Sequence, residues 1–152
     1  MAAGDIVWFR QALLDFGKKL HDVSTDTIKL GLVDSTITPS ATTADPRWGA
    51  GGSTNLAANQ VPTGSSYSTG GPSLTTVTWT LVSNVATLRA DVVTIAQDAT
   101  GFTNARWGII YNSTDAGKRA LGFVDLGSAR SVVSGSLAID WNGATNDIFT
   151  LT

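Results

Sequence analysis

The 152-residue chain contains no cysteine, no glutamate and only one histidine. The missing cysteines exclude disulfide bonds, thiolate zinc sites and cysteine nucleophiles. A single histidine, His21, is too few for a histidine-rich metal site, and we expect neither a metal nor another cofactor. Charged residues make up only 14% of the chain, with twelve acidic and ten basic side chains. This balance is unlike the basic surface of nucleic-acid-binding proteins, so we expect no nucleic-acid partner.

Long apolar runs are also lacking. No stretch of about 18 apolar residues exists, and the sequence therefore predicts no membrane span. The N-terminus lacks the apolar block of a signal peptide, which predicts synthesis and folding in a cytoplasm. The chain is nevertheless 42% hydrophobic, enough for a core, and contains 35 serine and threonine residues. Because these types favour strands and turns, the composition predicts a mainly β protein with one domain over residues 1–152.

The one predicted helix spans residues 5–20. Its apolar residues recur at helical spacing and form a single stripe. The stripe consists of Ile6, Phe9, Leu13, Phe16 and Leu20. Asp5 is placed to accept the free N–H groups of the first turn, and His21 is interpreted as a cation at the helix end. The polar side is thin, so the helix packs either on its own sheet or on a neighbouring subunit.

From residue 26 the apolar pattern alternates with a period of two, as in strands. The predicted strands are residues 27–33, 74–82, 85–88, 91–96, 105–112, 119–126, 136–141 and 147–151. Asn142 and Gly143 predict a hairpin between the last two. Short strands without intervening crossover helices predict an antiparallel β-sandwich or jelly-roll-like domain of seven or eight strands, with its main array over 74–152.

Residues 34–73 form the outlier, a long segment rich in Pro, Gly, Ser and Thr with little periodicity. We predict an ordered loop lying on a surface of this chain or of a neighbour, since loops of this length are usually functional or disordered. A single helical turn is predicted over 55–60. Trp48 within the loop is either an exposed binding anchor or an inward side chain that pins the loop, and both interpretations stay open.

Catalytic constellations are not apparent. A serine or threonine nucleophile needs an adjacent base, and His21 is the only histidine. No Gly-x-Ser-x-Gly motif occurs. The strand carboxylates Asp91, Asp125 and Asp140 each stand alone beside apolar residues, unlike the carboxylate pair of a glycosidase. The sequence therefore predicts a protein that is not an enzyme.

An ordered set of segments suggests a family. It runs Asp26-Thr-Ile-Lys-Leu-Gly-Leu-Val33, Tyr67-Ser-Thr-Gly-Gly71, Leu74-Thr-Thr-Val-Thr-Trp79, Ala90-Asp-Val-Val93, Ala105-Arg-Trp-Gly-Ile-Ile-Tyr-Asn-Ser-Thr114, Leu121-Gly-Phe-Val-Asp-Leu-Gly127, Gly135-Ser-Leu-Ala-Ile-Asp-Trp141 and Asp147-Ile-Phe-Thr-Leu151. In this order the segments resemble a family of small structural proteins of tailed-bacteriophage virions. The resemblance covers about residues 9–152 and implies a non-enzymatic role in the particle.

The resemblance leads us to expect a capsid decoration, or cement, protein. It would bind the outer surface of the assembled phage head, bridge units of the major capsid protein and act as a homo-oligomer, a dimer or trimer. The expected contact residues are Ile6, Phe9, Leu13, Phe16, Trp48 and Tyr67. Two alternatives stay open. One is a tail or head–tail connector protein, and the other is a β-sandwich carbohydrate-binding module with Trp48 and Tyr67 exposed together.

Overall fold

The computed structural model describes residues 6–141 and 145–151. The fold is mainly β with several antiparallel sheets, as predicted, in an arrangement consistent with a β-sandwich-like domain. The central sheet has the strand order β1-β9-β8-β2 and is antiparallel throughout. Its strands are β1 (Ile6–Trp8), β2 (Ile28–Val33), β8 (Ala105–Asn112) and β9 (Ala120–Arg130).

Three smaller sheets accompany the central one. A three-stranded antiparallel sheet has the order β11-β6-β5, and β10 pairs with β7. The bounds are β5 Thr78–Val82, β6 Val85–Arg89, β7 Val93–Ile95, β10 Leu137–Ile139 and β11 Asp147–Leu151. A short parallel pair, β3 (Pro46–Arg47) and β4 (Thr54–Asn55), lies in the long loop. All eight predicted strands are present, whereas β1, β3 and β4 were not predicted.

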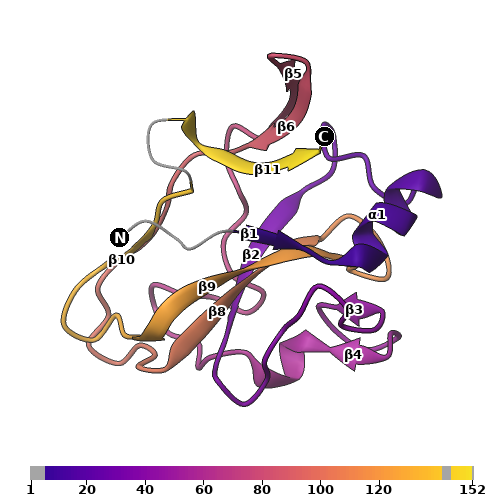
Figure 1. Ribbon diagram of the computed structural model, residues 1–152. Coiled ribbons are helices and arrows are strands. Elements are labelled where there is room, and N and C mark those ends of the chain that lie inside the picture. Colours follow the sequence, from indigo (N-terminus) through magenta and orange to yellow (C-terminus); the bar gives the residue numbers. More distant parts are fainter. Residues whose placement is uncertain (1–5, 142–144, 152) are drawn as a thin grey trace.

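Different parts of the chain cover the two faces of the central sheet (Figure 1). On one face, the ring of Phe149 from β11 fills the space where Gly122 of β9 has no side chain. The same ring stacks on Trp8 of β1, with centroids 3.6 Å apart. Phe123 points to the opposite face, because successive side chains of a strand alternate. There it contacts Phe9 at a centroid distance of 5.2 Å, and β3 and β4 lie on the same side.

The helix is shorter than predicted. α1 spans Arg10–Gly17, while Ile6–Trp8 forms β1 and pairs with β9. The prediction of one helix over 5–20 was therefore wrong at both ends. Phe9 is the N-cap and makes no side-chain capping bond, and the predicted cap Asp5 lies outside the described residues. The apolar spacing of residues 6–9 fits a helix, but pairing with β9 satisfies the backbone of residues 6–8 as a strand.

The predicted hairpin between the last two strands does not form. β10 pairs with β7, whereas β11 pairs with β6 in a different sheet. Asn142 and Gly143 themselves lie outside the described residues. A turn-forming sequence favours local reversal of the chain, but each strand here pairs with a partner more distant in sequence.

The long loop completes the open edge of β2. Backbone bonds of 2.8–3.1 Å connect Asp34 with Asn59, Leu32 with Val61, Leu30 with Pro72 and Ile28 with Leu74. Between them, the backbone N–H of Leu32 donates to the hydroxyl of Tyr67 at 2.7 Å. The loop is therefore ordered and lies on its own domain, one of the two surfaces predicted for it. The predicted helical turn is also confirmed, as the 3₁₀ helix η1 (Leu56–Asn59).

Trp48 fixes the middle of the loop against the second face of the central sheet. Its indole lies over Gly31 of β2, where any side chain would collide with the ring. The indole also stacks on Tyr111 of β8, with centroids 5.0 Å apart and planes 9° apart. Both Trp48 and Tyr67 belong to the buried core. Of the two interpretations of Trp48, the inward one is therefore confirmed.

Asp98 attaches the loop at a second place. Its carboxylate accepts hydrogen bonds from the N–H and hydroxyl groups of Thr100 and Ser65, at 2.7–3.0 Å, and from the N–H of Ser66 at 3.3 Å. These donors, first those of Thr100, hold the pKa of Asp98 well below its usual range. One carboxylate thus connects the end of the long loop to the segment that follows β7.

Replacing Gly31 by alanine places a methyl group within the volume of the Trp48 ring. We expect the free energy of unfolding to fall by about 1–3 kcal/mol, because the ring must leave its stack on Tyr111. Urea unfolding followed by circular dichroism measures this loss. Gly17→Ala is the control, since nothing lies within 4 Å of the added Cβ. An equal loss in both variants would contradict the role assigned to Trp48.

Tyr67→Phe removes the acceptor of the Leu32 N–H and leaves that group buried without a partner. We expect a loss of about 1–3 kcal/mol in the free energy of unfolding. The control is Thr63→Ala, an exposed change in the same loop, which should stay within about 0.5 kcal/mol of the wild type. Unchanged stability of the phenylalanine variant would show that the loop does not depend on this bond.

Candidate functional site

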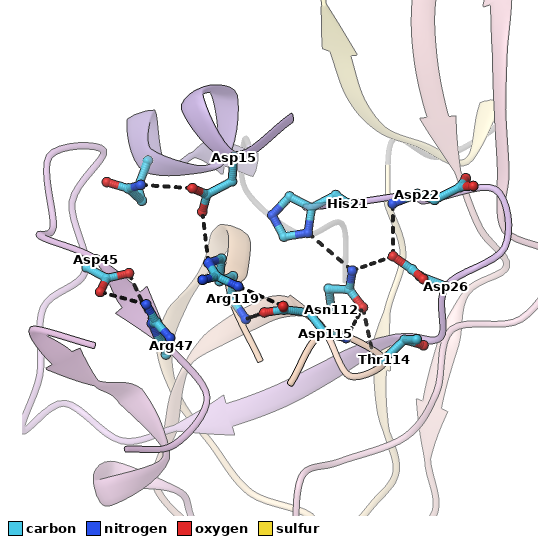
Figure 2. A network of polar contacts seen from close by, with 11 residues as sticks. Asp15, His21, Asp22, Asp26, Asp45, Arg47, Asn112, Thr114, Asp115 and Arg119 are labelled. Carbon is cyan, nitrogen blue, oxygen red and sulfur yellow. Dashed lines mark hydrogen bonds and ion pairs between the residues drawn. The ribbon is translucent and has the colours of Figure 1, made fainter. Parts of the chain in front are cut away.

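A buried polar network connects α1, the segment after it and the turn between β8 and β9 (Figure 2). Asn112, the last residue of β8, is fully buried at its centre. Its side-chain oxygen accepts the N–H groups of Thr114 at 2.9 Å and Asp115 at 3.1 Å, which shapes the turn. Its amide nitrogen donates to Asp26 at 2.6 Å and lies 3.2 Å from Nδ1 of His21.

His21 is not the helix-end cation that the sequence suggested. α1 ends at Gly17, and His21 lies beyond it with only 8% of its surface exposed. Burial lowers the pKa of His21, and this effect outweighs the opposing charges of Asp15, Asp115 and Asp26. The ring is therefore neutral at pH 7. Because the Asn112 amide donates to Nδ1, we assign the ring proton to Nε2.

Arg119 links the turn to the helix. Its guanidinium donates to Asp115 at 2.7 Å, and its Nε lies 3.7 Å from the carboxylate of Asp15 in α1. Asp15 is almost fully buried and also accepts a bond from Gln11 at 2.9 Å. One oxygen of Asp15 and Nε2 of His21 are buried and make no hydrogen bond within the described part of the chain. The charged groups thus fix α1 on the domain.

The same turn also holds the long loop. The backbone N–H of Trp48 donates to the carbonyl of Lys118 at 2.9 Å. Beside it, Arg47 and Asp45 form a two-point ion pair at 3.0 and 3.1 Å. Sequence reasoning placed none of these residues together, because they come from segments up to about 100 positions apart and no local motif joins them.

No hydroxyl group is hydrogen-bonded to His21 within residues 6–141 and 145–151. Asp91 accepts bonds from the hydroxyls of Thr75 and Thr76, and Asp125 pairs with Arg106.

The described residues contain no group of three side chains suited to a metal ion. In the same part of the chain, no helix has the length and apolar character needed to cross a membrane.

The outward side of α1 presents apolar surface. Leu13 and Leu14 are adjacent, with 42% and 51% of their surfaces exposed. Beyond the end of the helix lies a hollow of about 420 Å³. It is lined by Phe16, Lys19, His21, Asp22, Val23 and Trp79. Together these features form a surface that we call the α1 surface, defined by Leu13, Leu14 and the lining of this hollow.

The six predicted contact residues have different positions. Phe9, Trp48 and Tyr67 are buried in the core and do not face a partner in this conformation. Ile6 and Phe16 are partly buried against the core, and Leu13 is exposed. The prediction therefore needs correction for the three buried residues, since burial against the central sheet satisfies them within the chain. Leu14 was missed because it lies beside the predicted apolar stripe.

Comparisons with known protein families, with curated proteins and with solved structures found no match to this chain.

The lowered pKa of His21 predicts a pH-dependent stability. The folded protein binds a proton at His21 less readily than the unfolded chain, whose histidine pKa is about 6.5. As the pH falls below about 6.5, the free energy of unfolding should therefore decrease, by at most about 1.4 kcal/mol per pH unit. Urea titrations between pH 7 and pH 5 measure this slope.

His21→Gln is the matched variant, because glutamine still accepts a bond from Asn112 but does not titrate. The chain has no other histidine, so the slope between these pH values should become smaller in this variant. Identical slopes in the two proteins would show that His21 is not buried in its neutral form.

Proposed function

We propose that the protein is a non-enzymatic structural protein of a tailed-bacteriophage virion, and that it decorates the outer surface of the head. The proposal rests first on the resemblance of the ordered sequence segments to that family. Its stabilising action would be mass action, since a protein that binds only the assembled, expanded lattice stabilises that lattice. Many identical weak contacts over the shell would add up through multivalency.

The α1 surface is the observation that carries the proposed contact. Leu13 and Leu14 face outward from a helix whose inner side is held by buried charges. Exposed apolar side chains on a rigid support are suited to a partner, because binding then orders few additional groups. The hollow beside the helix would accept an apolar side chain of the major capsid protein.

The long loop is not a contact element in this proposal, although its residues Trp48 and Tyr67 were expected to contact a partner. Its aromatic residues Trp48 and Tyr67 are buried, and its backbone completes the edge of β2. Deleting it would unfold the domain and would not test binding. A carbohydrate-binding module would need these two rings exposed together as a platform, so this alternative is not proposed.

Binding to heads tests the proposed function. Heads of the phage that encodes this chain, assembled without the protein, are mixed with purified protein and sedimented. We expect the wild type to saturate a regular set of sites. The double variant Leu13→Asp/Leu14→Asp should bind about tenfold or more weakly, because burial of one leucine contributes about 1.5–3 kcal/mol.

The control is Val92→Asp, which changes an apolar residue of similar exposure, 42%, away from α1. Melting curves establish that all three proteins are folded. Equal binding by the wild type and the double variant would remove α1 from the contact. Failure of the wild type to bind heads, together with binding to tails or assembly into tubes, would support the tail or connector alternative.

A further inference from the structure

Strand β5 forms an open edge of the three-stranded sheet. The order β11-β6-β5 places β5 at one side, and the β5–β6 hairpin projects beyond the rest of the molecule (Figure 1). Within the described ranges, no backbone group of β5 is bonded to any strand except β6. Leu81 on this strand has 72% of its surface exposed. A loop covers the edge of β2 through backbone bonds, whereas no described residue bonds to the outward backbone groups of β5.

The hairpin geometry shows which backbone groups of β5 point outward. Ser83 and Asn84 form a two-residue turn with positive φ values of 51° and 67°. The flanking pair Val82–Val85 is then hydrogen-bonded, and such pairs alternate along an antiparallel ladder. The N–H and C=O groups of Trp79 and Leu81 therefore face the open edge.

These outward groups are complementary to those of a second copy. If two β5 strands pair antiparallel with Thr80 opposite Thr80, then Trp79 of each copy lies opposite Leu81 of the other. Each of these residue pairs exchanges two backbone bonds, so all four outward groups of each strand find a partner. On one face, the exposed Leu81 side chain would pack beside the Trp79 ring of the second copy.

The chemistry of the edge favours this partner. No charged residue occurs between Arg47 and Arg89, a stretch that includes all of β5 and its turn. Monomeric proteins usually protect an edge strand with a charge, a proline or a bulge. β5 has none of these, and its pairing with β6 is in continuous register. No like charges would meet when two identical edges approach.

We propose that two copies of this chain associate through β5 in antiparallel orientation, forming a continuous six-stranded sheet across a two-fold axis at Thr80. The interface is isologous, so it closes as a dimer and does not propagate. This association goes beyond the proposed virion function and does not depend on it. Trp79 belongs both to β5 and to the lining of the hollow, so the β5–β5 ladder shares this one residue with the α1 surface. Leu13 and Leu14 lie outside the ladder, and a dimer would present two copies of this leucine pair to a capsid.

Sedimentation of the full chain over about 1 μM to 1 mM measures whether the protein forms a dimer. Charged substitutions at Thr80, the centre of the proposed interface, then test where the two copies meet. Thr80 is exposed, so charged substitutions there should leave the monomer folded. Thr80→Lys and Thr80→Asp each place like charges opposite one another. We expect each to raise the dimer dissociation constant by about tenfold or more. An equimolar mixture of the two should dimerise again, because opposite charges then meet.

Thr150→Lys is the matched control, an exposed threonine at the other side of the same sheet, on β11. It should dimerise like the wild type. A wild type that stays monomeric throughout the range overturns the proposal, as does a Thr80→Lys variant with undiminished dimer. Dissociation by Thr150→Lys alone would place the contact on β11. Open-ended fibres in place of a dimer would show that the edge pairs without two-fold closure. Head binding has a separate readout, so either proposal can fail alone.

Discussion

The edge of β2 that no strand of the central sheet pairs with is the constraint on which the arrangement of this protein depends. β2 ends the central sheet, yet it is buried, so its outward N–H and C=O groups have no access to water. Residues 59–74 supply the missing partners through backbone bonds and the Tyr67 hydroxyl. The long loop is therefore as much a part of the sheet as a regular strand. Its fixed course brings Trp48 over Gly31 and onto Tyr111.

As a consequence, the long loop belongs to the core of the domain, and the short helix α1 carries exposed apolar side chains. The loop, which resembles a binding loop in composition, is structural. The short helix α1 is fixed by Asp15 and Arg119 on its inner side and exposes Leu13 and Leu14 on its outer side. Exposed leucines are found instead on α1, at Leu13 and Leu14, and on the β5–β6 hairpin, at Leu81.

Several elements of the fold were predictable because their signal is local. Alternating side chains located β2, β5, β8 and β10, and short apolar runs located β6 and β7, because both signals lie within a few neighbouring residues. The extent of the helix was not predictable. The spacing of the apolar residues 6–9 is compatible with a helix, and only the folded chain shows that residues 6–8 pair with β9 as a strand. Of the candidate site, Leu13 and Phe16 could be predicted from the helical stripe. The network around Asn112 could not, because its members meet only in the folded chain.

The sequence by itself determined the mainly β class, the positions of most strands and the lack of cysteine chemistry. These properties follow from composition and from periodicity within a few residues. Only the tertiary structure decided which strands pair, which face Trp48 takes and whether His21 is charged. Strand pairing depends on which edges meet in the folded chain. β10 therefore pairs with β7, and β11 pairs with β6, although an Asn-Gly sequence lies between β10 and β11. The charge of His21 depends on burial, which is a property of the assembled domain.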